Sequence, residues 1–446
     1  MEVAVIRRRL TSTLSGVLGV LALIAGSQAF AQSAPTEITY WHVWGGARLP
    51  MVEKMIADFE ALHPDITVEH TLLDQGDMAA RYLTAIAAGD PPDVMMMHSG
   101  RFFPTFANRG VLLDLGPYLE RDGMDVNEIF YGSDVSNYTW NGKVYGLPVS
   151  TDNGGWNFFY DVDAFVEAGL DPNKPPTTWQ ELEEYAAALT VRENGKITRL
   201  GFSPASTENY AFKEWLYLNN GQFISDDGRQ ILFNSDEGLT TLSWMVGFYD
   251  RLYGGFNNVL ALVGEPSVSG RNIKGNWYNG LVAMHVDGVW HLAQLAENAP
   301  DKNVRASLMP YNGENPDARV RNVGGIGWAY SIPVGSSNPD AAWEFVKYTT
   351  AGEGNLNFFL AQGRPTPVIA FNDDPRFAEG NPYLDAFLAN AAATDGIVNS
   401  PVQDEIDRIV MEMTEAALLG KMTPQAALEK GAKDAQAALD EFWSNQ

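Results

Sequence analysis

The sequence predicts an α/β fold divided into at least two lobes, and two observations carry this prediction. The chain has 446 residues, which exceeds the length at which a single hydrophobic core usually stops growing. Between residues 38 and 97, apolar runs of strand length alternate with stretches of helical periodicity. This βαβαβ order is typical of a doubly wound sheet covered by helices, and ligands bind such sheets outside the carboxyl ends of the strands.

The first three strands and two helices are predicted in order from apolar periodicity. Residues 38–43 form a strand, and the helix after it ends at His63-Pro64. The apolar face of that helix consists of Met51, Met55, Ile56, Phe59 and Leu62. A strand at 66–68, a helix at 78–88 and a continuous apolar strand at 94–97 follow. We therefore expect residues 44–46 and 98–100, which follow the first and third strands, to share one rim of the sheet.

The later elements are predicted from strand runs and helix caps. Residues 146–169 contain a strand, a polar loop around Trp156, a second strand at 158–160 and a helix that starts at 163. Thr178 and Glu181 have capping-box spacing and open a helix over 182–189. Residues 208–260 are predicted to be mostly helical, and Asn338 is expected to cap a helix over 341–349. The C-terminal remainder is also predicted to be helical.

The N-terminus has the pattern of a cleaved export signal. Three arginines at 7–9 precede the apolar run 17–25, and residues 29–31 (AFA) supply a small-residue cleavage site. We predict that residues 1–31 are a signal peptide, that cleavage follows Ala31, and that the mature protein is periplasmic. The apolar run is shorter than the roughly 20 residues of a membrane span, and no later run approaches that length. A soluble mature protein without membrane insertion is expected.

Charge and cysteine content exclude several classes of partner. The formal net charge is −26, and it becomes −28 when residues 1–31, with three arginines and one glutamate, are removed. Such a surface repels nucleic acid and anionic membranes. The chain has no cysteine, so an exported protein must be stabilised by its core instead of disulfides, and an N-terminal lipid has no acceptor. We expect a freely diffusing monomer.

Several segments together carry a resemblance to one protein family. They are residues 146–148 (GLP) with the aromatic strand 158–160, residues 90–94 (DPPDV) followed by 103–115, and residues 280–284 (GLVAM) followed by 287–290 (DGVW). In this order, spread over nearly all of the chain after residue 38, they resemble the extracellular solute-binding proteins of ATP-binding-cassette (ABC) importers, in particular the sugar-binding group.

The resemblance implies a clamshell of two α/β lobes, each a sheet flanked by helices, joined by three hinge crossovers. The crossovers would lie at the start of 146–169, at 321–333 and at 363–367. The N-terminal lobe would combine residues 32–148 with 327–366, and the C-terminal lobe residues 149–326 with 367–446. The implied function is capture of a mono- or oligosaccharide by lobe closure and delivery to an ABC import permease, with no cofactor and no catalysis.

Candidate ligand contacts follow from the chemistry of sugars and from the resemblance. A sugar offers hydroxyls and C–H patches, so its site needs polar groups and aromatic faces, and Trp44, Trp156, Trp277, Trp290 and Trp328 lie near predicted strand ends or in loops. The full candidate set is Trp44, Gly45, His98, Ser99, Asp152, Asn153, Trp156, Trp277, Asp287, Trp290, Gly324, Gly325 and Arg364. The glycine-doubled loop at 152–156 is longer than the usual family pattern, which leaves its contact open.

Other ligands and activities stay open at this point. A phosphorylated polyol such as glycerol 3-phosphate would need arginines or a helix N-terminus in the site, and only Arg364, Arg48 and Arg101 are placed for it. The tryptophans would also permit a cationic compatible solute in an aromatic cage. A glycoside hydrolase would need two carboxylates across a cleft, for which Asp152 and Asp287 are the candidates.

A metal site is the last alternative. His285, Asp287 and His291 form the one close cluster of potential ligands in the sequence. Their spacing lacks the i, i+4 histidine pair of a helical zinc site and suits ligation from a strand poorly. No metal is expected.

Overall fold

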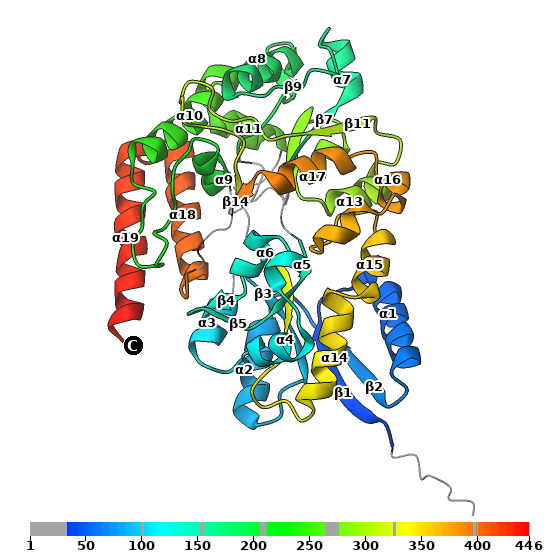
Figure 1. Ribbon diagram of the computed structural model, residues 1–446. Coiled ribbons are helices and arrows are strands. Elements are labelled where there is room, and N and C mark those ends of the chain that lie inside the picture. The colour runs from blue at the N-terminus through cyan, green and yellow to red at the C-terminus, as the bar shows by residue number, and fades with distance from the viewer. Residues whose placement is uncertain are drawn as a thin grey trace, which may run out of the picture. The chain divides into compact units, whose positions relative to one another are not determined.

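The computed structural model describes residues 34–99, 102–151, 156–205, 211–263, 276–323, 327–395, 398 and 400–445. One compact unit spans residues 35–446, and most of its helices and strands are labelled in Figure 1. The predicted signal peptide lies outside the described residues. Within the described part of the chain, no helix combines the length and apolarity that a membrane span requires.

The larger sheet has five strands in the order β2-β1-β3-β13-β6. Its strands are β1 (Thr36–His42), β2 (Ile66–Leu72), β3 (Val94–His98), β6 (Leu147–Ser150) and β13 (Trp328–Ser331). The strands β2 and β3 both pair with β1 in parallel, as the βαβαβ order predicts. Strand β13 inserts antiparallel between β3 and β6, so the sheet is mixed. The carboxyl ends of β1, β3 and β6 and the amino end of β13 therefore meet at one rim.

Helices and short elements surround the larger sheet. They are η1 (Gly46–Arg48), α1 (Leu49–Leu62), α2 (Met78–Ala88), α3 (Phe103–Asn108), α4 (Gly116–Asp122), α5 (Val126–Ile129), α6 (Gly132–Ser136), the hairpin β4 (Thr139–Trp140) and β5 (Lys143–Val144), α14 (Pro339–Thr350), α15 (Glu353–Leu360), η3 (Ile369–Asp373) and α16 (Arg376–Gly380). Helices α1, α14 and α15 pack on one another. Their buried side chains, with those of the sheet, form a first core drawn from residues 38–149 and 329–384.

The second sheet is antiparallel, with β7 (Asn157–Asp161) between β10 (Met284–Asp287) and β11 (Val304–Ser307). Phe158 and Tyr160 point into a second core drawn from residues 156–309 and 406–439. Phe159, on the opposite face of the strand, packs in a third, smaller cluster with Trp277 and Phe387. The strand β7 is therefore buried on both faces.

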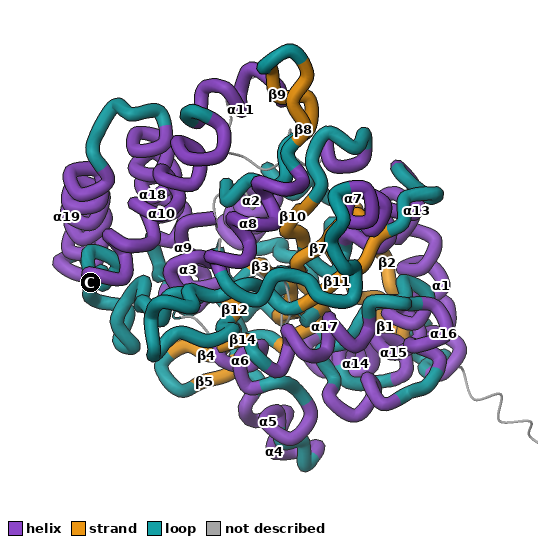
Figure 2. Tube along the Cα trace, turned by 90° about the horizontal axis from the view of Figure 1, so that it is seen from above, coloured by secondary structure: helices purple, strands orange, loops and turns teal. Residues whose placement is uncertain are grey.

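The remaining elements accompany the second sheet. They are α7 (Val162–Glu167), α8 (Trp179–Leu189), β8 (Val191–Glu193), β9 (Lys196–Arg199), α9 (Ala211–Tyr217), α10 (Asp236–Tyr253), α11 (Phe256–Val263), α13 (His291–Asn298), β12 (Asn322–Val323), α17 (Leu384–Ala392), β14 (Thr394–Asp395), α18 (Gln403–Leu418) and α19 (Pro424–Ser444). Strands β12 and β14 pair in parallel. In Figure 2 most strands lie among the helices, whereas the β8–β9 hairpin is at the periphery.

The fold has two separate large cores, and each is assembled from segments that alternate along the chain. This arrangement agrees with the predicted division into two lobes, but the exact lobe boundaries stay a prediction. Val368, Phe377 and Leu384 pack in the first core, beyond the predicted boundary at residue 366. The chain passes between the cores more than once, because residues 329–384 return to the first core after 156–309 have contributed to the second.

Several local predictions are corrected by the structure. Leu62 was placed on the buried face of α1 but is 62% exposed, and Val52 is buried instead. Residues 218–235 interrupt the helical region with turns and an isolated bridge between Ile224 and Ile231. Strand β10 begins only at Met284, so Asp287 ends a strand and does not lie in the loop after it.

Of two predicted helix caps, the one at α8 is confirmed in full, whereas the one at α14 differs in its hydrogen bonding. The capping box of α8 is present, with the Thr178 side chain accepting from Glu181 N and the Glu181 carboxylate accepting from the Thr178 backbone. Asn338 is the N-cap of α14, as predicted, but its side chain makes no capping hydrogen bond. It donates to the Glu37 carbonyl at 3.0 Å instead.

Candidate functional site

The rim of the larger sheet brings together four aromatic and polar residues. The His98 and Trp328 rings meet edge to face, with centroids 4.7 Å apart, and the Trp44 ring lies 6.1 Å from Trp328. Ser99 is joined to this rim by two hydrogen bonds to Gly327. The Ser99 N–H donates to the Gly327 carbonyl, and the Ser99 hydroxyl accepts from the Gly327 N–H. The predicted positions after β1 and β3 are thus neighbours. Trp328 joins them because β13 inserts beside β3.

Trp44 is held inside the first core. Its ring is 2% exposed, its Nε1 donates to the Tyr330 hydroxyl at 3.0 Å, and the Arg48 guanidinium carbon lies 4.7 Å from the ring centroid. Trp328 is partly exposed, and Gly45 also keeps part of its surface. Trp328 is therefore the accessible tryptophan at this rim, and the buried Trp44 ring packs against it.

Two neighbouring histidines, His42 and His70, lie beneath the same rim. The Trp44 N–H donates to His42 Nδ1 at 3.1 Å, so that nitrogen is unprotonated, and His42 Nε2 lies 3.1 Å from His70 Nδ1. Burial, with a smaller contribution from His70, lowers the pKa of His42 to about 3. The loop after β1 is therefore positioned by an uncharged imidazole near neutral pH.

The rim of the second sheet carries a pair of tryptophans. Trp156 precedes β7, and Trp290 is the N-cap of α13, which follows β10. Their rings meet edge to face with centroids 5.6 Å apart and 76° between the planes. Trp156 is 6% exposed, whereas Trp290 is partly exposed. As at the first rim, one buried indole supports one accessible indole.

Asp287 lies inside the second sheet region and is 4% exposed. Its Oδ2 lies 2.9 Å from His291 Nδ1 and 3.5 Å from His285 Nε2, and its Oδ1 accepts from Gly288 N at 2.8 Å. The carboxylate thus fixes the start of the loop that carries Trp290. Trp277 is fully buried and packs against the same histidines, so its ring supports this network.

The three potential metal ligands come together in the fold. His291 begins helix α13, and the ligand atoms of His285, Asp287 and His291 lie within 4.8 Å of one another. Their proximity in the fold therefore contradicts the expectation that their spacing keeps them from meeting as ligands. However, Trp277 Nε1 donates to His291 Nε2 at 3.2 Å, and an indole N–H can only donate. If His291 bound a metal through Nδ1, its proton would lie on Nε2 and would face the Trp277 N–H. The three side chains therefore fit a hydrogen-bond network and do not fit a metal ion.

Five of the predicted ligand contacts remain. One of them, Arg364, is buried, and the other four lie outside the described residues. Arg364 follows α15, is buried, and has its guanidinium carbon 5.2 Å from the Phe359 ring centroid. Asp152, Asn153, Gly324 and Gly325 lie outside the part of the chain that the structure describes, as does Arg101. Their role stays a prediction, and so does the paired-carboxylate arrangement of Asp152 with Asp287.

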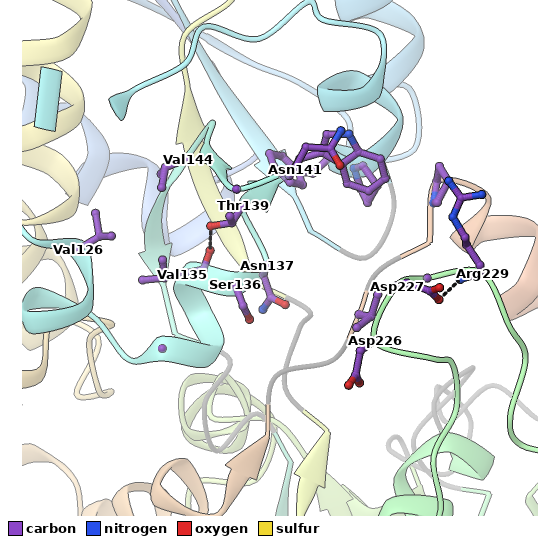
Figure 3. Close-up of a pocket in the computed structure, with 18 of the residues that line it drawn as sticks. Val126, Val135, Ser136, Asn137, Thr139, Asn141, Val144, Asp226, Asp227 and Arg229 are labelled. Carbon is purple, nitrogen blue, oxygen red and sulfur yellow. Dashed lines mark hydrogen bonds between the residues drawn. The ribbon is translucent and has the colours of Figure 1, made fainter. Parts of the chain in front are cut away.

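A pocket of about 960 Å³ lies away from the predicted loops. Its lining includes Asn137, Trp140, Asp226, Asp227, Arg229 and Trp443. Figure 3 shows Asn137 on one side of it and Asp226 and Asp227 on a loop opposite. These residues were not predicted, because the helix-to-hairpin segment 136–144 and the loop 225–230 have no local pattern that signals a site. We call it the Asn137 pocket.

Comparison with known proteins gives matches over most of the chain. The model of the bacterial extracellular solute-binding protein family matches residues 49–355. The sn-glycerol-3-phosphate-binding periplasmic protein UgpB of Shigella dysenteriae serotype 1 is 26% identical over an alignment of 452 residues, which covers 95% of this chain and 95% of that protein. UgpB of Brucella melitensis biotype 1 is 29% identical over an alignment of 453 residues, which covers 96% of this chain and 98% of that protein.

A solved structure confirms the predicted architecture. The ABC transporter solute-binding protein from Thermotoga lettingae, bound with α-D-tagatose, aligns with a TM-score of 0.74 at 24% identity, covering 91% of this chain and 100% of that chain. At this identity the likeness establishes the fold. The chain therefore has the predicted α/β fold with two lobes.

Proposed function

Since this chain belongs to the family of bacterial extracellular solute-binding proteins, we propose that it captures a sugar in the periplasm and presents it to the permease of an ABC importer. The first 31 residues would direct export, and the mature protein would act as a monomer without a cofactor. Catalysis is not part of the proposal. Binding followed by release of unchanged ligand is the whole reaction.

The observation that carries the proposal is the pair of accessible indoles, Trp328 at the rim of the larger sheet and Trp290 at the rim of the second sheet. Each rests on a buried tryptophan, Trp44 or Trp156, and so is held in one orientation. Indole faces suit the C–H patches of a sugar ring. Neighbouring backbone groups would supply hydrogen-bond donors and acceptors for hydroxyls, whereas His98, which is 3% exposed, packs edge to face against the Trp328 ring.

The strength required of such a site is modest. A micromolar dissociation constant corresponds to about 8 kcal/mol. Two aromatic platforms at about 1 kcal/mol each beyond area burial, with several hydrogen bonds at about 1 kcal/mol each, approach this value when the site is preformed. Rigid support of both indoles keeps the ordering cost low.

Lobe closure would couple capture to delivery. A ligand shifts the population toward a closed form only if it binds that form more tightly, which a sugar that touches Trp328 and Trp290 at once would do. Small-angle scattering with and without a ligand that binds tests this step. Compaction is expected, and a ligand that binds without compaction would refute the closure mechanism.

Thermal-shift screening against a carbohydrate panel tests the ligand class. A ligand at about 100 times its dissociation constant stabilises the native state by roughly 2.7 kcal/mol, which raises the melting temperature measurably. Chromatography of the recovered ligand should show no cleavage, and turnover would favour the hydrolase alternative. A panel in which no carbohydrate raises the melting temperature would refute the proposed ligand.

A phosphorylated polyol is the second candidate, because the UgpB relatives are named for sn-glycerol 3-phosphate. Arg364 is buried beside Phe359 and Arg48 lies over Trp44, and either cation would suit a phosphate. Glycerol 3-phosphate belongs in the same screen. Stabilisation by this anion and by no neutral sugar would favour the second candidate.

A further inference from the structure

We propose that the Asn137 pocket is a further subsite for neutral carbohydrate, which takes the distal rings of an oligosaccharide. This inference rests on the proposed function and extends it from a sugar to a chain of several sugars. The pocket volume of about 960 Å³ is at the upper end of the range for small-molecule sites. A single sugar ring would leave much of it to water.

The strongest sign of a ligand is the side chain of Asn137 at the end of α6. This residue is 3% exposed and lines the pocket. Within the described part of the chain, neither its amide nitrogen nor its amide oxygen has a hydrogen-bond partner. A buried polar group without a partner destabilises the fold. A sugar hydroxyl can both accept from the amide nitrogen and donate to the amide oxygen, so a carbohydrate would satisfy both atoms.

Aromatic faces lie in the same pocket. The indoles of Trp140, on the β4–β5 hairpin, and Trp443, near the end of α19, are parallel to within 1°, with centroids 6.5 Å apart. The Arg229 guanidinium carbon lies 4.2 Å from the Trp443 ring centroid, which orients that indole. Aromatic surface beside hydroxyl-binding groups is the combination that sugar rings require.

The charges around the pocket select a neutral ligand. Its lining contains two carboxylates, on Asp226 and Asp227, and one guanidinium, on Arg229. Asp227 accepts from Ser225 Oγ and from Arg229 N, which fixes the loop, and Asp226 is exposed. The local charge is therefore negative and disfavours a phosphate or a sugar acid. Carboxylates are also good acceptors for sugar hydroxyls.

The pocket walls come from both cores. Val135 packs in the first core, whereas Trp443 packs against the second. Near the pocket, Thr105 Oγ1 in α3 donates to the Pro401 carbonyl at 2.9 Å, which joins segments of the two cores. A ligand in the Asn137 pocket would thus contact both lobes and would favour the arrangement that brings these walls together.

The test compares ligands of increasing length in wild type and three variants by isothermal titration calorimetry. The probes are linear manno- and gluco-oligosaccharides from one ring to several. Asn137→Ala and Trp140→Ala should each weaken the longer chains about five- to tenfold, as expected for a lost pair of hydrogen bonds or a lost aromatic face. Binding of monosaccharides should not change. Asn357→Ala, at an exposed position of α15, is the matched control and should bind all probes as wild type does.

A second measurement separates a ligand-binding role from a structural one. Asn137→Ala removes a buried amide without a partner, so the unliganded variant should melt at the wild-type temperature or above it. A lower melting temperature would show that the amide serves the fold. Inorganic phosphate should not compete with the oligosaccharides, and competition would overturn the choice of a neutral ligand.

The outcomes distinguish this inference from the function on which it rests. Equal loss for mono- and oligosaccharides, or no loss in either variant, would overturn the subsite while sugar binding stands. Wild-type affinity that does not increase with chain length would also overturn it. Failure of every carbohydrate to bind would overturn the proposed function and this inference together.

Discussion

Trp290 meets Trp156 edge to face, with ring centroids 5.6 Å apart and 76° between their planes. The two indoles differ in exposure, since Trp156 is 6% exposed and Trp290 is partly exposed. One ring is thus a wall of the second core, and the other offers a face to solvent. Because of this difference in exposure, replacing Trp290 by alanine and replacing Trp156 by alanine should have different effects.

Trp290→Ala is expected to weaken sugar binding about tenfold, because one aromatic platform contributes roughly 1 kcal/mol beyond area burial. Its melting temperature should stay near that of wild type. Trp156→Ala should instead lower the free energy of unfolding by about 3 kcal/mol or more, the usual cost of deleting a buried indole. Calorimetric titration and urea denaturation of both variants measure the two effects. Equal destabilisation by both would contradict the division of roles.

Gly288→Ala tests whether the position of Trp290 matters apart from its presence. A Cβ at residue 288 would lie 2.2 Å from the Trp290 ring, so the indole must move. We expect about a tenfold loss of sugar affinity, similar to the loss from Trp290→Ala. Asn357→Ala, at an exposed position of α15, is the control and should bind sugar as wild type does. Wild-type affinity in Gly288→Ala would show that the ring orientation is not used.

Structural features that depend on local sequence patterns, such as helix bounds and helix caps, were predicted well. Helix α2 has the predicted bounds, 78–88, and α8 has the predicted capping box. These features depend on side chains within one or two turns of each other. The parallel pairing of β1, β2 and β3 was also predicted, because short βαβ connections leave few alternatives.

Features that depend on distant segments were not predictable in the same way. Trp328 reaches the rim because β13 inserts between β3 and β6. No local pattern specifies this strand pairing, although the family resemblance assigned residues 327–366 to the N-terminal lobe. Trp44 and Trp328 also differ in exposure, which local sequence did not predict. Trp44, which follows β1, is buried, whereas Trp328, which begins β13 in the same sheet, is partly exposed. The Asn137 pocket was missed for the same reason, since its walls are joined only by tertiary contacts.

The stability of the protein should fall in mild acid because of His42. The native-state pKa of His42 is about 3, whereas an unfolded histidine titrates near 6.5. Between these values the unfolded state binds a proton that the native state does not, so stability rises with pH in this window. Lowering the pH from 7 to 5 should cost about 2 kcal/mol through this residue.

His42→Gln isolates that contribution. Glutamine does not titrate, so the difference in unfolding free energy between wild type and variant should narrow by about 2 kcal/mol between pH 7 and pH 5. Urea denaturation at several pH values measures this difference. A gap that stays constant over this range would show that the imidazole is not held neutral by burial.

Asp93 is expected to fix the start of helix α14. Its Oδ1 accepts from Ser336 Oγ and from the backbone N–H groups of Ser337 and Asn338, and its Oδ2 accepts from the backbone and hydroxyl of Thr39. One carboxylate thus connects β1 to the segment that leads into α14. It also performs the capping role that the Asn338 side chain does not.

Asp93→Asn should therefore lower the free energy of unfolding by about 3 kcal/mol, because the amide nitrogen would face donors and leave some of them without an acceptor. Asp58→Asn is the matched control, since among the described residues Asp58 pairs with Lys54 in an i, i+4 contact on α1, and such exposed pairs contribute less than about 0.5 kcal/mol. The urea midpoint should shift strongly in the first variant and little in the second. Similar shifts in both would mean that the buried carboxylate contributes no more than a surface charge, and that α14 is positioned by its apolar face alone.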